Sequence, residues 1–259
     1  MIVTSADSCM GLVSLQIEHQ RVALQLARKF GNHSFTELNP REHLEHLCGH
    51  LDEGWSQTDF ETPNDPALGL PYDFRFLPFE QISRAWEKTI SQLAAYHPFC
   101  GILASQLYCR HCESCPNSWQ DELVRHFIEA ETRRQNKLKL SLSKEFLTEH
   151  YTNSKLLETS LAQLVFFDVL ALDLISPKSD GRRYIVPRKE GEGQVLTLVR
   201  VSQSAYSLSP FPFIGNKIEV CIRRFRLPSL KNQTALNYSN ILPELEQVID
   251  TIQIIRKTY

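Results

Sequence analysis

Apolar residues in the first two-thirds of the chain recur every three or four positions, which is the spacing of amphipathic helices. Gly31 follows the first apolar segment, and Pro40 and Gly54 bound the second, as expected for helix ends. The last helical segment is apolar on almost every face, which is typical of a helix buried in the middle of a bundle. The pattern predicts helices over residues 16–30, 40–53, 79–93, 119–139 and 156–175, and a buried helical turn over 100–108.

The pattern changes after Pro177, where β-branched residues alternate with polar ones. Residues 194–201 and 217–225 are predicted to be antiparallel strands, with 184–187 as a third strand and 207–213 as a proline-fixed loop. A terminal amphipathic helix is expected to pack on the bundle through Leu245, Ile249 and Ile252. We therefore expect a mainly α fold. Residues 1–176 form a helical core, and residues 177–259 add a small antiparallel hairpin or three-stranded sheet and a helix, as one structural unit.

Composition places the chain among ordinary globular proteins. Its net charge is −2, with 42% hydrophobic and 22% charged residues, which excludes a disordered chain and a nucleic-acid binder driven by bulk positive charge. No apolar run is long enough for a transmembrane helix, so no membrane partner is expected. The seven cysteines and the absence of a basic segment before the first apolar stretch favour a reducing, cytoplasmic location. A small molecule is the expected partner.

Charge is unevenly distributed along the chain. Residues 1–90 carry seven basic and thirteen acidic residues, whereas residues 178–231 carry eleven basic and four acidic ones. The basic stretch is either a patch for phosphate or another anion, or the solvated outer face of strands.

Three histidines share one face of the second predicted helix. His43, His46 and His50 stand at spacings of three and four, which places them within roughly 60° of one another around the helix axis. Imidazole is a common transition-metal ligand, so the stripe indicates a metal site or, alternatively, a polar flank beside the buried leucines.

Two carboxylates strengthen the metal interpretation. Asp52 follows His50 closely at the end of this helix, and Asp168 interrupts the most apolar helix of the chain. A lone buried carboxylate costs several kcal/mol unless it is paired or binds a metal. A hydrogen bond to a helix N-terminus, or a helix rotated to expose Asp168, would explain it without a metal.

A cysteine cluster forms a separate candidate site. Cys109, Cys112 and Cys115 have the C-x₂-C-x₂-C spacing found in zinc and iron–sulfur proteins, with His111 between two of the thiols. Structural zinc, an iron–sulfur cluster, a redox-active pair and cysteines without a metal all remain open.

Two resemblances emerge from these residues. The order of His19, the His50/Asp52 pair and the distant Asp168 resembles the HD-domain superfamily of helical metal-dependent phosphohydrolases. The chain also resembles, nearly end to end, an uncharacterised bacterial family known as a domain of unknown function. The matching segments are the opening MIV, Gln16-Ile17-Glu18-His19, Asp52-Glu53-Gly54-Trp55, Gly69-Leu70-Pro71-Tyr72-Asp73-Phe74, Trp86, His97-Pro98-Phe99-Cys100-Gly101, Asp168-Val169-Leu170-Ala171-Leu172 and Ser209-Pro210-Phe211-Pro212-Phe213.

The chain departs from the pattern at two places. Leu51 stands where a histidine would directly precede Asp52, and Ser105-Gln106-Leu107 stands where another histidine is expected. On a continuous helix, His50 and Asp52 point about 200° apart, so they converge only if the helix unwinds there.

The HD resemblance implies a hydrolase of a phosphorylated small molecule or nucleotide. The metal, Mn, Fe, Zn or Mg, would be held by His19, His50, Asp52 and Asp168. Glu53 or His46 would move protons, and substrate phosphates would be bound by Arg21, Arg182 and Arg183. The alternative is a ligand-binding or protein-interaction member of the uncharacterised family that catalyses no reaction.

Overall fold

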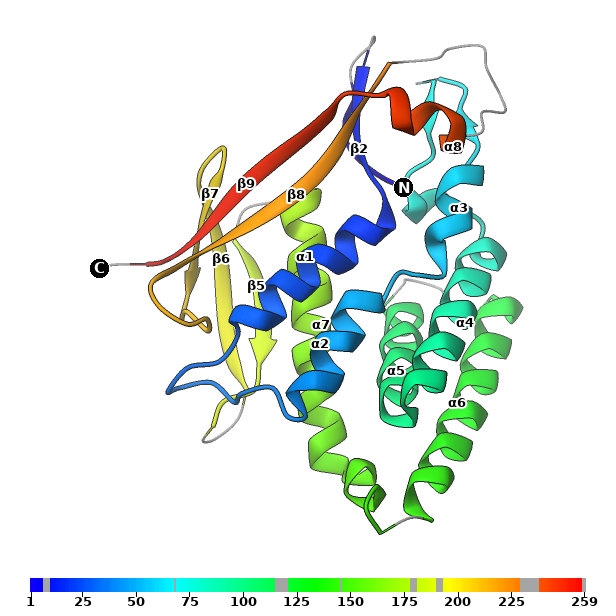
Figure 1. The fold of residues 1–259 in the computed structure, drawn as a ribbon, viewed down its shortest axis with the longest axis vertical. Coiled ribbons are helices and arrows are strands. Elements are labelled where there is room, and N and C mark those ends of the chain that lie inside the picture. The colour runs from blue at the N-terminus through cyan, green and yellow to red at the C-terminus, as the bar shows by residue number, and fades with distance from the viewer. Residues whose placement is uncertain are drawn as a thin grey trace.

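The structure is a computed structural model of the 259-residue chain. It describes residues 1–6, 10–67, 69–114, 121–144, 146–177, 181–189, 193–228 and 238–257. The fold is mixed α/β, with a strongly curved sheet on one side and a helical layer on the other (Figure 1). No helix in these ranges is long and apolar enough to cross a membrane.

The sheet has seven strands in the order β1-β2-β8-β9-β7-β6-β5. All neighbouring strands are antiparallel except β7 and β9, which run parallel. The long central pair, β8 and β9, joins the N-terminal hairpin to the β5–β7 meander (Figure 1). The strands are β1 (Ile2–Ala6), β2 (Met10–Ser14), β5 (Arg182–Val186), β6 (Gln194–Ser202), β7 (Ala205–Ser209), β8 (Lys217–Pro228) and β9 (Gln247–Arg256).

Two helices connect the sheet to the rest of the helical layer. α1 (Gln16–Lys29) contacts β8, and α7 (Ser154–Ile175) contacts β5, while the two helices also pack on each other (Figure 1). The outer helices are α2 (Arg41–His50), α4 (Phe79–Tyr96), α5 (Pro98–Glu113) and α6 (Glu122–Ser143). Shorter elements are α3 (Trp55–Glu61), β3 (Asn64–Asp65), β4 (Leu70–Pro71), α8 (Tyr238–Ile241) and 3-10 turns over Phe74–Phe76, Glu149–Thr152 and Leu242–Glu244.

The sequence of α7 explains its central position. The Asn153 side chain caps its first turn by accepting a hydrogen bond from the Leu156 amide at 3.0 Å. Phe166, Phe167 and Leu170 are buried in the main core, which extends from the sheet to α5. The prediction of a buried central helix over 156–175 agrees with this element.

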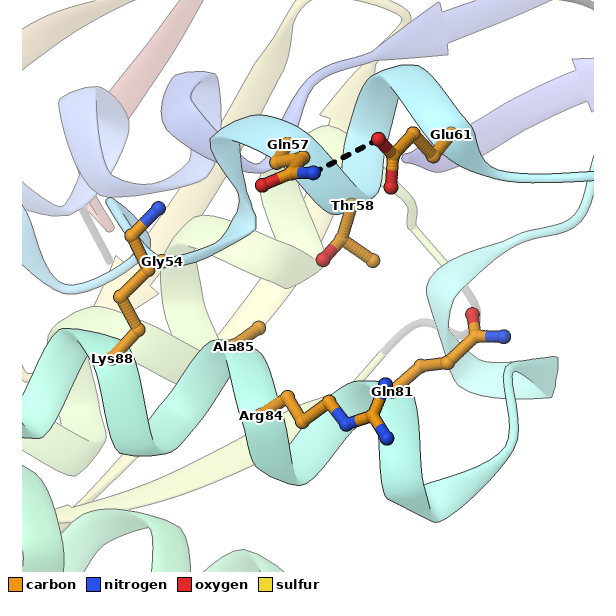
Figure 2. A pocket seen from close by; sticks show the side chains of 8 residues that line it. All are labelled: Gly54, Gln57, Thr58, Glu61, Gln81, Arg84, Ala85 and Lys88. Carbon is orange, nitrogen blue, oxygen red and sulfur yellow. Dashed lines mark hydrogen bonds between the residues drawn. The ribbon is translucent and has the colours of Figure 1, made fainter.

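α3 and α4 approach closely at Gly54. A Cβ atom at this position would lie 2.0 Å from the backbone oxygen of Ala85, so only glycine fits. The Gly54 amide donates to Oγ1 of Thr89 at 3.0 Å. Figure 2 shows residues of α3 and α4 that line a cavity of about 360 Å³ beside this contact. The close contact fixes the turn that carries Asp52.

The prediction of a mainly α fold with a small C-terminal sheet is wrong. The predicted terminal helix is the strand β9, in which Ile252 and Ile254 are buried against the helices while Ile249 is 63% exposed. Its apolar residues also fit helical spacing, but four isoleucines and a valine favour an extended chain that has strand partners on both sides.

Other strand predictions need correction too. The N-terminal strands β1 and β2 were not predicted, and they extend the sheet along β8. The segments 194–201 and 217–225 are strands, as predicted, but β7 and β9 separate them. β7 also occupies part of the segment that was predicted to be a proline-fixed loop.

Candidate functional site

A cavity of about 710 Å³ lies between α1, α4, α5 and α7. Much of its wall is apolar and aromatic, and Trp86 stacks on Tyr108 with ring centroids 4.8 Å apart and planes at 12°. Among its polar side chains, His19, Asp52 and Asp168 are buried. The aromatic and aliphatic lining consists of Trp55, Phe74, Phe79, Ile82, Trp86, Tyr108, Val124 and Leu172.

Four titratable side chains form a continuous row at this cavity. Nδ1 of His19 lies 2.8 Å from Oδ2 of Asp52, and its Nε2 lies 2.8 Å from the backbone oxygen of Asp168. Nε2 of His111 lies 3.1 Å from Oδ2 of Asp168. The order is therefore Asp52, His19, Asp168 and His111, and all four line the cavity. His111 has the most exposed side chain of the four.

His19 is an imidazolium in this arrangement. Both of its ring nitrogens face oxygen acceptors, so both must carry a proton to donate. Burial disfavours the charged ring, but the Asp52 carboxylate outweighs burial, with help from Asp168, and raises the pKa of His19 to about 9. In this arrangement both ring nitrogens of His19 are occupied as hydrogen-bond donors.

Asp168 remains a carboxylate despite its burial. Burial alone raises its pKa, but the adjacent His111 and His19 outweigh that effect and bring the pKa of Asp168 below its ordinary value. Pairing with two histidines explains the carboxylate in the most apolar helix of the chain.

The turn after α2 positions Asp52. The Asp52 amide donates to Oε1 of Gln20 at 2.8 Å, and the Tyr108 hydroxyl donates to the backbone oxygen of Leu51. Because α2 ends at His50, Asp52 turns inward to His19. His50 instead faces outward, where its Nδ1 lies 2.5 Å from Oε1 of Glu53.

The comparisons with known proteins identify a family. A family model described as "Protein of unknown function (DUF3891)" matches residues 1–229. The chain belongs to the DUF3891 family. No curated protein and no solved structure matches it, and nothing in these comparisons supports a resemblance to HD domains.

The donor set of this DUF3891 protein does not fit a bound metal ion. Within the parts of the chain that the structure describes, no three histidine, cysteine or carboxylate side chains are arranged to hold one. Of the four predicted ligands, His19, Asp52 and Asp168 come together, but His50 does not join them. His19 uses both nitrogens as donors, which leaves none for coordination.

The remaining predicted catalytic and binding residues lie mostly elsewhere. His46 stacks on Tyr96 and His50, with centroids 3.5 and 4.1 Å away, and Glu53 pairs with His50, so neither lines the cavity. Arg21 pairs with Glu18, and Arg183 is exposed on β5. Only Arg182 lines the cavity, with its Nε 3.3 Å from Oδ2 of Asp173.

The cysteines of the predicted zinc site diverge along α5. Cys109 faces α6, where Nε2 of Gln135 lies 3.9 Å from its sulfur, and burial raises the pKa of its thiol to about 12. Cys112 lines the cavity. Cys115 lies outside the described residues.

Sequence reasoning missed the role of His111 in the main cavity. His111 stands inside the cysteine cluster, which drew attention to zinc coordination rather than to Asp168. Helical spacing could have placed His111 at the cavity. Tyr108 and His111 are three positions apart, so they share one face of α5, and that face lines the cavity.

Proposed function

We propose that the cavity binds a small, flat, uncharged carbonyl compound and that His111 acts as a general base in its hydrolysis. The observation that carries the proposal is the His111–Asp168 contact of 3.1 Å in the wall of a cavity of about 710 Å³. A histidine held by a buried carboxylate at the edge of a pocket is suited to proton transfer.

The hydrogen-bond pattern assigns a nitrogen to this step. Because Nε2 of His111 donates to the Asp168 carboxylate, the neutral ring carries its lone pair on Nδ1. The side chain is 33% exposed, so a ligand or a water molecule can reach it. When Nδ1 takes up a proton, the resulting imidazolium is stabilised by Asp168.

Two buried donors support a carbonyl ligand. Nε2 of Gln16 and Nε1 of Trp55 belong to cavity-lining residues, and neither has a hydrogen-bond partner among the described residues. An unpaired buried donor costs about 1–3 kcal/mol. Both atoms are covered by protein in this structure, so a ligand acceptor would reach them after the lining side chains move. A carbonyl oxygen is such an acceptor, and the donors would bind it more strongly as negative charge develops.

The proposed chemistry is a balanced ester hydrolysis. Nδ1 of His111 takes a proton from water as the water oxygen bonds to the carbonyl carbon, and the carbonyl π electrons move to oxygen. When that oxygen re-forms the double bond, the ester C–O bond breaks and His111 returns the proton to the leaving oxygen. The alcohol and the acid are the products.

The charges around the cavity favour an uncharged substrate. Arg75 contacts both carboxylate oxygens of Asp73, at 2.5 and 2.7 Å, and Arg182 is occupied by Asp173. Each arginine among the described lining residues thus has a carboxylate partner, which argues against the phosphorylated substrate predicted from the sequence. A cavity that binds the same compounds without turnover is the second candidate, favoured by its largely apolar lining.

Chromogenic esters test the proposal. We expect slow hydrolysis of 4-nitrophenyl acetate but not of 4-nitrophenyl phosphate, and a loss of about 100-fold in kcat/KM in His111→Gln. His126→Gln, which removes an exposed histidine on α6, is the matched control. Equal rates in the two variants contradict the proposal. Phosphate ester hydrolysis that requires Mn²⁺ and is lost in His50→Gln would favour the metal-dependent hydrolase instead.

A further inference from the structure

We propose a second ligand site, separate from the main cavity, that binds a small anion with two charged groups, such as diphosphate. It consists of two adjacent cavities of about 340 and 410 Å³, and Arg188 lines both. Neither shares a residue with the cavity of the proposed function. The inference is therefore independent of that function.

Basic side chains dominate both cavities. The first is lined by His33, Arg188, Arg256 and Lys257, and no acidic residue contributes to its described wall. The second is lined by Lys155, Arg188 and Lys189, with Glu37 as its acidic member. Arg188 and Lys189 from the basic stretch 178–231 thus meet basic residues of more distant segments at these two cavities.

The guanidinium groups here lack carboxylate partners. Nη1 of Arg188 lies 3.2 Å from Oε1 of Gln194, and Nη2 of Arg256 lies 3.3 Å from the backbone oxygen of Gly215. Within the described ranges neither arginine forms an ion pair, and neither does Lys155. Arg75, Arg182 and Arg224, by contrast, are each paired with an aspartate. The unpaired charges are therefore available to an external anion.

Backbone contacts hold the site in shape. The Lys189 amide donates to the Ser34 oxygen at 3.3 Å, and the Thr36 amide donates to the Pro187 oxygen at 3.4 Å. Nδ2 of Asn32 donates to the Phe211 oxygen at 2.8 Å. These bonds join the loop after α1 to the ends of β5 and β7. A site assembled before the ligand arrives loses less conformational entropy on binding.

The shared arginine determines the class of ligand. A guanidinium has five donors in a fixed fork, so Arg188 can contact one anionic group on each side. Arg256 and Lys257 would bind the first group. Lys155 would bind the second, beside the Lys189–Glu37 ion pair, in which Nζ and Oε1 lie 3.6 Å apart. Phosphate groups match this donor geometry. The two small cavities fit a diphosphate better than an extended nucleic-acid backbone.

Calorimetric titration of the full-length protein with sodium diphosphate and sodium orthophosphate tests the inference. We expect diphosphate to bind at least tenfold more tightly than orthophosphate, because only diphosphate reaches both cavities. Arg188→Gln should weaken diphosphate binding by at least tenfold. Lys137→Gln, which removes an exposed lysine on α6, should change it less than twofold. Thermal unfolding of each variant checks that it is folded.

Three results would overturn the inference. Equal affinities for the two anions would exclude a bipartite site. Equal losses in Arg188→Gln and Lys137→Gln would show that net charge alone attracts the anion. Binding of a short single-stranded DNA more tightly than diphosphate, with the same dependence on Arg188, would identify a nucleic-acid surface instead.

Discussion

Nδ1 of His19 lies 2.8 Å from Oδ2 of Asp52, although 33 positions separate the two residues. The contact joins α1 to the turn after α2, and the other ring nitrogen of His19 joins both to the backbone of α7. One charged ring thus links three segments beside the cavity. The pair both stabilises the fold and fixes Asp168, on which the position of His111 depends.

Replacing Asp52 with asparagine should lower the free energy of unfolding by about 3 kcal/mol, because the buried imidazolium of His19 loses its counter-charge. Urea denaturation followed by circular dichroism measures the free energy of unfolding. The control Glu158→Gln, which neutralises an exposed carboxylate on α7, should change this free energy by less than about 0.5 kcal/mol. A loss below about 1 kcal/mol in Asp52→Asn would mean that His19 is neutral in the folded protein.

The stability of the protein should fall as the pH rises from neutral to alkaline. The pKa of His19 is about 9 in the folded state, above its ordinary value of 6.5, so the folded state holds an extra proton between these values. The contribution of protonated His19 to the free energy of unfolding is complete below pH 6.5. It is lost as the pH passes through about 9, at on the order of 1 kcal/mol per pH unit. Unfolding free energies of wild type and His19→Gln, measured from pH 6 to pH 10, test this. Parallel curves would contradict the assignment of a charged His19.

Gly54→Ala should destabilise the protein, whereas Gly49→Ala should not. The new Cβ at position 54 would meet the Ala85 backbone oxygen, which cannot move away, so we expect a loss of about 3 kcal/mol. At position 49 the nearest atom is a Leu24 methyl carbon at 3.2 Å, and alanine favours the helix, so stability should be unchanged or rise by up to about 1 kcal/mol. Thermal unfolding distinguishes the two. Equal stabilities would show that α3 and α4 are not in close contact at Gly54.

Much of the helical layer could be predicted, because its apolar periodicity is long and bounded by clear stop residues. The segments 79–93 and 156–175 correspond to α4 and α7. The sheet could not be predicted to the same extent, because strand pairing depends on contacts distant in sequence. β9 reaches its partners β7 and β8 only in the folded chain, and its helical spacing is coincidental.

The candidate site was predicted in part. Asp168 stood out as a carboxylate among apolar residues, and the structure places it with His19 and Asp52. His50 was grouped with Asp52 by proximity in sequence, but the end of α2 between them sends the two side chains in different directions. The part played by His111 depends on packing between α5 and α7, which no local pattern reveals.

Histidine side-chain NMR tests most directly whether the cavity beside His111 binds a small carbonyl compound, because it reports ligand contact without requiring turnover. We predict that benzamide, a flat uncharged carbonyl compound, shifts the ring resonances of His111 at millimolar concentration and leaves those of the exposed His126 in place. Phenyl phosphate should not shift His111. If benzamide leaves His111 unmoved, or shifts His126 equally, the cavity is not the small-molecule site that we propose.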